Sequence, residues 1–342
     1  MKIDLLSLTT GVRRQSSQIL AALLLFCISG CNKEASTAGS GTNSPAQGTI
    51  SGKSIAVIPK GSTHSHWKSV EAGAKKAGAE LGYEILWKAP LKENDRAQQI
   101  AIVEQFVSEG VAGIVLAPLD DVALLRPVKG AVSKGIPVLL FDSGLKGEQG
   151  KDFISYVGTD NKLGGKLGGE ELARLLNGKG KVVLLKYSEG SASTAEREAG
   201  FLEAIKQHPG IQLIVDNRYG GVTASEAQAT ALNMLDQLRE ADGIFCSNES
   251  LTMGMLLALR QNNLTGKAKF VGFDASAQLV EALRKGEIQA LVAQNPKKMG
   301  YEGVKAMVRH IKGEKLPAVI DSGVQLITPE NIESEAVKEL FK

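Results

Sequence analysis

Short apolar runs rich in β-branched residues alternate with longer helical patterns from residue 53 to residue 327. Ile55–Ile58 has the composition of a buried strand, and in 67–82 the apolar residues recur at helical spacing. Strands this apolar, alternating with helices, indicate parallel sheets that are covered on both faces. The predicted strands are too many for one sheet, so we predict an α/β fold with two doubly wound parallel-sheet lobes. Within this pattern, 153–157 is expected to be a strand and 224–238 a single helix.

The first thirty residues have the pattern of an export signal rather than of a folded domain. Arg13 and Arg14 precede an apolar run over 19–28, which is too short to span a bilayer as a permanent helix. The run leads into the sequence ISGC at 28–31, which resembles the bacterial lipobox, whose Cys becomes the lipidated first residue. The alternative is an ordinary signal peptide cleaved nearby. The pattern favours a lipoprotein, with Cys31 as the lipidated residue.

Residues 31–52 follow the predicted signal peptide (1–30) and contain almost no large apolar side chain. Such a segment cannot bury enough surface to offset its chain entropy, so we expect a flexible tether there. Anchor and tether together would hold the domain at a membrane, on the periplasmic side of the cell envelope.

The charge balance argues against a nucleic-acid partner. The full chain carries +3, and residues 1–30 contain three basic residues and one acidic residue, so their removal leaves +1. No basic run suggests a surface for phosphates. Cys246 lies in the apolar run 244–246, which indicates a buried structural thiol rather than a reactive one.

Polar side chains gather directly after the predicted strands, where doubly wound sheets hold their ligands. Carboxylates, side-chain amides and an Arg fork can each bond two neighbouring hydroxyls, and an aromatic face can cover the C–H side of a sugar ring. This mixture suits an uncharged polyol better than an anion. The candidate binding residues are His64, His66, Trp67, Asp142, Ser143, Arg197, Asn248, Asp274 and Gln294.

Some of these residues also have a purely structural interpretation. Asp274 could cap the next helix, and Asn248 could belong to a turn. Arg197 could pair with Glu196 or Glu203 on a solvated helix face. Taken singly, these structural roles compete with binding. As a set at successive strand ends, the residues favour a binding site.

Several short motifs occur in a fixed order between residues 54 and 327. They are Ala72-Gly73-Ala74 with Leu81-Gly82-Tyr83, Gly135-Ile136-Pro137-Val138 with Asp142, Gly158-Thr159-Asp160-Asn161 with Gly164-Gly165, 190–197 before Gly200-Phe201, Ser247-Asn248-Glu249 before Gly254, Val271-Gly272-Phe273-Asp274, and Ala293-Gln294. In this order they resemble the periplasmic sugar-binding proteins of ABC importers, the ribose-binding-protein group. The resemblance implies ligand contacts at Asp142, Arg197, Asn248, Asp274 and Gln294, with first-loop contacts at His64, His66 and Trp67.

The resemblance also implies two lobes joined by three crossing strands, near 156–157, 293–294 and 320–321. The lobes it implies are an N-terminal one of 53–156 plus 295–321 and a C-terminal one of 157–294 plus 322–342. Ligand contacts on both lobes imply closure about the hinge when ligand binds. The implied partners are a small sugar-like ligand and an ABC transporter permease, and we expect a monomer without a cofactor.

The chain departs from the ribose pattern at two places. Ser143 follows Asp142 where ribose binders have Arg, and His64, His66 and Trp67 replace an Asn and a pair of Phe. The different hydrogen-bonding groups make ribose doubtful, so a different monosaccharide or a related polyol is expected. If His64 or His66 contacts the ligand as neutral imidazole, affinity should weaken below about pH 6.

Other functions fit the sequence less well. An enzyme with a dinucleotide is disfavoured because Gly164-Gly165 and Gly168-Gly169 lie inside a helical pattern rather than after a strand. His64 and His66 provide too few ligands for a closed metal site, so no metal is expected. The lac-repressor group shares the core fold, but a signal peptide occupies the place of its DNA-binding headpiece. A sensor subunit that docks on a membrane receptor or a histidine kinase remains an alternative to transport.

Overall fold

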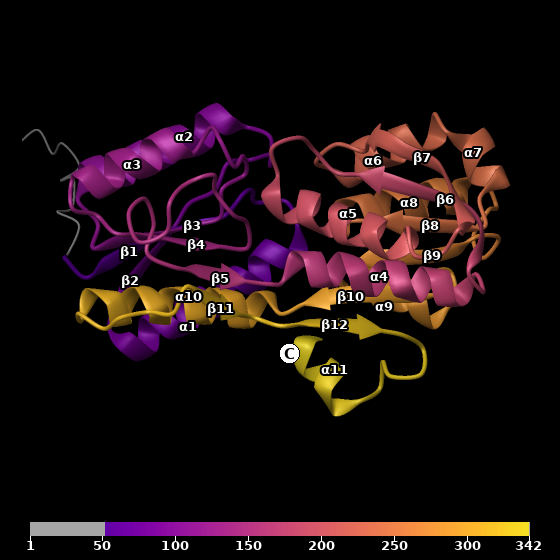
Figure 1. Cartoon of the computed structure of the whole chain (residues 1–342). Coiled ribbons are helices and arrows are strands. Elements are labelled where there is room, and N and C mark those ends of the chain that lie inside the picture. Colours follow the sequence, from indigo (N-terminus) through magenta and orange to yellow (C-terminus); the bar gives the residue numbers. More distant parts are fainter. Residues whose placement is uncertain (1–51, 342) are drawn as a thin grey trace, which may run out of the picture. The chain divides into compact units, whose positions relative to one another are not determined.

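Two six-stranded sheets organise the chain, which the computed structural model describes over residues 52–341 (Figure 1). The first sheet, in the order β11-β5-β4-β3-β1-β2, is parallel throughout. Its strands are β1 (Ser54–Ile58), β2 (Glu84–Trp87), β3 (Gly113–Leu116), β4 (Val138–Phe141), β5 (Tyr156–Gly158) and β11 (Val319–Asp321).

In the second sheet, β12-β10-β9-β8-β6-β7, only β12 runs antiparallel to its neighbour. Its strands are β6 (Lys179–Lys186), β7 (Gly210–Tyr219), β8 (Gly243–Cys246), β9 (Lys269–Phe273), β10 (Ala290–Gln294) and β12 (Val324–Ile327). The predicted α/β fold with two lobes is confirmed.

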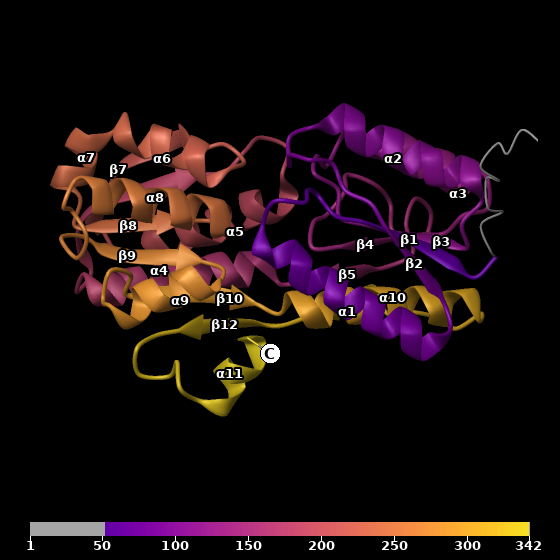
Figure 2. The same cartoon turned by 180° about the vertical axis from the view of Figure 1, so that it is seen from behind.

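Helices cover both faces of the first sheet. They are α1 (Ser65–Leu81), α2 (Arg96–Glu109), α3 (Leu125–Ser133) and α10 (Pro296–Ile311). α1 and α10 lie side by side on one face, and α2 and α3 cover the other (Figures 1 and 2). Along β1, Ile55 and Val57 join the core cluster that contains α1 and α10 residues, whereas Ala56 and Ile58 join the one that contains α2 and α3 residues. Because side chains alternate across a strand, both faces of β1 are buried, and its sequence is therefore continuously apolar.

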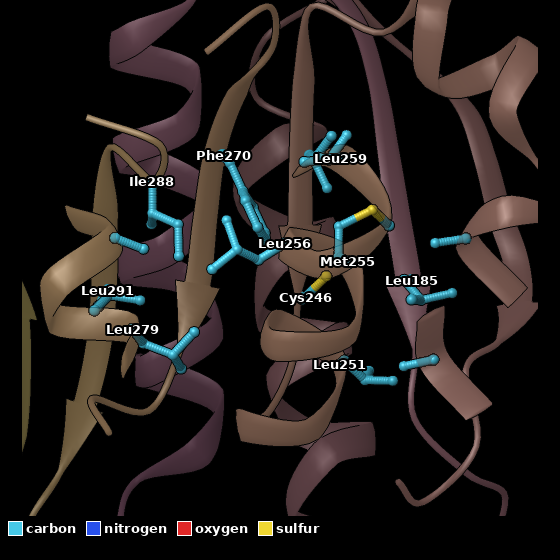
Figure 3. Packing of buried hydrophobic residues seen from close by; sticks show 14 of the residues in the cluster. Leu185, Cys246, Leu251, Met255, Leu256, Leu259, Phe270, Leu279, Ile288 and Leu291 are labelled. Carbon is cyan, nitrogen blue, oxygen red and sulfur yellow. The ribbon is translucent and has the colours of Figure 1, made fainter. Parts of the chain in front are cut away.

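The second sheet is covered in the same way. Its helices are α4 (Asn161–Leu175), α5 (Ala192–Ile205), α6 (Ala224–Leu232), α7 (Leu235–Glu240), α8 (Glu249–Gln261) and α9 (Ala277–Arg284), and α11 (Glu335–Phe341) follows β12. Cys246 is fully buried in the larger core cluster of this lobe, beside Leu251, Met255 and Leu256 (Figure 3). Burial raises the pKa of its thiol well above the ordinary value, which confirms the prediction of a buried structural thiol.

Glycines inside two helices allow α4 and α5 to pack closely. A Cβ atom at Gly165 would lie 1.8 Å from the Arg197 carbonyl oxygen, and one at Gly200 would lie 2.0 Å from the Lys162 carbonyl oxygen. Glycine within a helix costs about 1 kcal/mol relative to alanine, and the close crossing explains its use here. The crossing also fixes Arg197, on α5, beside Asn161, on α4.

The chain passes between the sheets three times: between β5 and α4, between β10 and α10, and between β11 and β12. β5 begins at Tyr156 rather than at 153, because Phe153 forms an isolated bridge with Gln149 instead. The helix predicted over 224–238 was wrong in one respect. It is interrupted where Met234 leaves helical geometry and its side chain enters the core.

The signal peptide, Cys31 and nearly all of the predicted tether lie outside the described residues. Within residues 52–341, no helix is both long and apolar enough to cross a membrane.

Candidate ligand-binding site

The segments that follow the strands of both sheets border one small cavity of about 30 Å³. Its wall consists of Lys60, His64, His66, Trp67, Glu93, Asp142, Tyr187, Ser193, Thr194, Arg197, Asn248, Asp274 and Gln294. Eight of the nine predicted binding residues are in this wall. Ser143 is not, although its hydroxyl accepts a hydrogen bond from the Ser193 backbone N–H at 3.2 Å. The structure therefore brings the predicted residues together and adds five others.

Asp142 follows β4 and supplies a buried carboxylate. One of its oxygens lies 3.1 Å from His66 Nε2, and the other lies 3.5 Å from Lys60 Nζ. Burial opposes the charged form, but Lys60 and His66 outweigh it and hold the pKa of Asp142 well below its ordinary value. The same carboxylate raises the pKa of His66, although burial of the ring acts in the opposite direction. Asp142 is thus a charged acceptor at neutral pH.

Lys60 connects the two lobes from the end of β1. Its Nζ donates to Ser193 Oγ at 2.8 Å and to Ser191 Oγ at 3.2 Å, and both serines lie at the start of α5. The Lys60 side chain is almost fully buried, so these partners and Asp142 satisfy a desolvated ammonium. Lys60 was not among the residues predicted from the sequence, although its position two residues after the first apolar run was a usable signal.

Glu93 joins three donors from two lobes in one place. Its Oε1 accepts from Trp67 Nε1 at 2.7 Å and lies 2.6 Å from His64 Nδ1, while its Oε2 accepts from the Tyr187 hydroxyl at 2.8 Å. Burial disfavours the charged carboxylate, yet the neighbouring His64 outweighs it and lowers the pKa of Glu93 to about 2. Glu93 lies in the loop between β2 and α2, away from any apolar run, and sequence reasoning missed it.

His64 lies between two groups that can only accept hydrogen bonds. Its Nδ1 faces the Glu93 carboxylate, and its Nε2 lies 3.1 Å from the carbonyl oxygen of Val222 in the other lobe. A neutral imidazole has one N–H, so both contacts are satisfied only by the doubly protonated ring. Burial alone would lower the pKa of His64, but the Glu93 carboxylate outweighs it and raises the pKa to about 9. His64 is therefore charged at neutral pH, contrary to the neutral ring considered from the sequence.

Arg197 projects from α5 into the cavity wall and is buried. Its Nε donates to Asn161 Oδ1 at 2.8 Å and its Nη1 donates to the Ser247 carbonyl oxygen at 3.1 Å. The guanidinium also lies 4.1 Å from the ring centroid of Phe273. The alternative pairing on a solvated helix face is wrong, because Arg197 is buried and the Glu203 carboxylate instead binds Lys162.

Asn248, Asp274 and Gln294 line the cavity from the ends of β8, β9 and β10 in the second sheet. Asp274 Oδ1 accepts from Gln294 Nε2 at 2.7 Å, and its Oδ2 accepts from the backbone N–H of Glu249 at 2.9 Å. It does not cap the next helix, whose N-cap is Ser276. Asn248 does have a structural role, since its Oδ1 caps α8 by accepting from the Leu251 N–H at 3.1 Å. The cap leaves its amide N–H groups to donate elsewhere.

His64 and His66 diverge, one to Glu93 and one to Asp142. Across residues 52–341, no cluster of three or more His, Cys, Asp or Glu side chains could hold a metal ion. The side chains around the cavity instead combine hydrogen-bond donors and acceptors, and both lobes contribute them.

Comparison with known proteins matches residues 55–315 to the family described as "Periplasmic binding protein domain". The ribose import binding protein RbsB of Haemophilus influenzae is 30% identical over 265 residues, which cover 76% of this chain and 86% of that protein. The chain belongs to the type I periplasmic sugar-binding proteins. The D-allose-binding periplasmic protein of Escherichia coli is a further relative of this sugar-binding protein, at 29% identity over 76% of this chain and 85% of that one.

Solved structures agree with this assignment. A carbohydrate transporter solute binding protein from Agrobacterium radiobacter, in complex with D-arabinose, is 32% identical with a TM-score of 0.80, covering 84% of this chain and 98% of that one. An ABC transporter solute binding protein from Agrobacterium vitis with bound D-fucose is 31% identical with a TM-score of 0.80, covering 83% and 98%. The family is periplasmic, and its members bind sugars for transport.

Proposed function

We propose that this sugar-binding protein captures a monosaccharide or a related polyol between its lobes and delivers it to the permease of an ABC importer. The observation that carries the proposal is the single cavity where strand ends from both sheets bring together eight residues expected from the sequence. The D-arabinose and D-fucose in the solved relatives support a ligand of this size. We further propose that the protein acts as a monomer and without catalysis.

The charges of the cavity favour an uncharged ligand. Lys60 faces Asp142 and His64 faces Glu93, and the buried Arg197 and Asp274 add one charge of each sign to the wall, so the buried charges largely neutralise one another. A charged ligand would leave one of these groups, or itself, buried without a counterion, which is strongly unfavourable. Hydroxyl groups can instead take the remaining lone pairs of the carboxylates and the remaining N–H groups of the amides.

Ligand entry requires the lobes to separate. A cavity of about 30 Å³ is far smaller than the roughly 300–1,000 Å³ of small-molecule sites. Side chains cross directly between the lobes here: Lys60 to Ser193, Tyr187 to Glu93 and His64 to the Val222 carbonyl. We propose that lobes 53–156 plus 295–321 and 157–294 plus 322–342 part about the three crossings and close again over a sugar.

A thermal-shift screen of the purified mature domain tests this function. A ligand that binds only the folded form stabilises it by about 2.7 kcal/mol at a hundredfold excess over Kd. We expect at least one pentose, hexose, deoxysugar or inositol to raise the melting temperature and to be recovered chemically unchanged. If no sugar raises it, the proposed function is wrong, and if the sugar is converted, the protein is an enzyme.

Lipidation of Cys31 gives a separate prediction. In cells that express the full chain, Cys31→Ser should move the protein from the membrane fraction to the soluble periplasmic fraction, because the acyl anchor is lost. The matched control is Cys246→Ala, which removes the other thiol of the mature chain without burying a hydroxyl in the core and leaves the proposed anchor intact. Retention of the Cys31→Ser protein in the membrane fraction would contradict the proposed anchor.

Sugar affinity should fall at alkaline pH, because His64 loses its proton there. Its pKa is raised from 6.5 to about 9, so its contribution to the closed form is complete below pH 6.5 and is lost as pH rises through 9. The matching Glu93 contribution is present above pH 4.5 and is lost toward pH 2. We expect constant affinity between pH 5 and pH 6.5 by isothermal titration calorimetry and at least about tenfold weaker binding at pH 10, with His64→Gln showing a smaller decline. An affinity loss below pH 6 instead would indicate a neutral ring in the complex.

A further inference from the structure

A second cavity, of about 440 Å³, adjoins the central one. It lies between the start of α1, the start of α9 and α11, and His66, Asp274 and Gln294 line both cavities. Its volume falls in the range of small-molecule sites, whereas that of the central cavity does not. We call it the outer cavity. Three of the proposed ligand contacts therefore also face a space that a single sugar in the central cavity would not fill.

The outer cavity contains a buried hydroxyl without a partner. Ser276 lines it, and within residues 52–341 its Oγ is the one buried side-chain nitrogen or oxygen that has no hydrogen-bond partner. Ser276 is the N-cap residue of α9, a position where Ser normally bonds to the first turn, but its side chain makes no such bond. The first N–H groups of α9 therefore lack this cap as well. The Oγ is covered in the observed rotamer, so a rotation about χ1 is needed to turn it toward the cavity. A ligand hydroxyl there could then satisfy both groups, because a hydroxyl donates and accepts.

The rest of the wall also suits a sugar. Ser69 adds a second hydroxyl, and Arg284, whose Nη2 binds Glu333 at 3.1 Å, adds further donors. Val280 and Leu340 form an apolar part of the wall from α9 and α11. A polyhydroxylated ring presents both hydroxyl groups and C–H faces, so it matches a wall of this mixed kind.

We propose that the outer cavity is a second saccharide subsite and that the preferred ligand is a disaccharide or a glycoside. Its first sugar would occupy the central site and its second unit would lie against Ser276 and the start of α9. Asp274 and Gln294 would contact both units. This proposal rests on the proposed sugar-binding function and extends it to a larger substrate class.

Filling the outer cavity tests the proposal. Ala277 lines this cavity at the exposed start of α9, and Gln278 is an exposed neighbour that does not line it. Calorimetry would compare wild type, Ala277→Trp and Gln278→Trp against D-ribose, D-allose, D-galactose and D-fucose, and against lactose, melibiose, cellobiose and maltose. We expect one disaccharide to bind wild type and Gln278→Trp at least tenfold more tightly than any monosaccharide. Ala277→Trp should remove this advantage while leaving monosaccharide affinity unchanged.

Ser276→Ala gives a second readout. The variant should be at least as stable as wild type, because it removes an unsatisfied buried hydroxyl, and it should weaken the disaccharide about fivefold without affecting monosaccharides. Binding of monosaccharides alone, or equal effects of both Trp variants, would overturn the second subsite and leave the proposed function intact. Failure of every saccharide to bind the folded wild type would overturn both.

Discussion

Asp274→Asn is expected to abolish most sugar binding while the unliganded fold stays intact. Both carboxylate oxygens already accept one hydrogen bond, from Gln294 Nε2 and from the Glu249 N–H, and each has a further lone pair for a ligand hydroxyl. Asparagine replaces one oxygen with an NH₂ donor, which must face one of these two donors. Loss of two charge-assisted bonds to the ligand should weaken affinity at least about 100-fold, equivalent to about 3 kcal/mol.

Asparagine is the appropriate substitution because Asp274 has a left-handed backbone, with φ at 68°. Asn adopts this conformation readily, whereas Ala would add strain to the loss of the carboxylate. The matched control is Asp121→Asn, since Asp121 also follows a strand but pairs with the exposed Lys146 at 3.3 Å. Circular dichroism would establish folding and calorimetry would measure affinity. Unchanged affinity in Asp274→Asn would remove Asp274 from the site.

The fold could be predicted from the sequence because buried strands have a recognisable, continuously apolar composition. A central strand of a parallel sheet covered on both faces is apolar over its buried length, as Ile55–Ile58 is, whereas the edge strands β2 and β7 also contain exposed polar residues. The wall of the cavity followed from the same rule. Asp142 and Asp274 come directly after apolar runs and Asn248 comes one residue later, and the carboxyl ends of parallel strands meet at one edge of a sheet.

The residues that were missed depend on contacts distant in sequence. Glu93 has no local pattern, and its role arises only when Trp67, His64 and Tyr187 reach it from two lobes. The charge on His64 could not be foreseen either, because it depends on Glu93 and on the Val222 carbonyl. Likewise, the interruption at Met234 follows from core packing, which overrides the helical pattern around it.

Glu93→Gln should cause the largest loss of stability. The substitution preserves shape but removes the counterion of the buried His64 imidazolium. Its NH₂ group fits only opposite the Tyr187 hydroxyl, which must then accept rather than donate, because Trp67 and His64 can only donate. Breaking a buried ion pair from one side costs about 3–5 kcal/mol. For a domain of this size we expect the melting temperature to fall by roughly 6–10 °C.

A double-mutant cycle separates the ion pair from general disruption. His64→Gln with Glu93→Gln leaves no unpaired charge, so the double variant should be destabilised by clearly less than the sum of the single variants. Glu104→Gln, on the exposed face of α2, is the matched control and should change stability by less than about 0.5 kcal/mol. Calorimetric melting at pH 6, where both groups of the pair are charged, would measure all four proteins against wild type. Strict additivity of the two substitutions would show that Glu93 stabilises the lobes through Trp67 and Tyr187 alone, and it would also remove the physical basis for the alkaline loss of sugar affinity expected from His64.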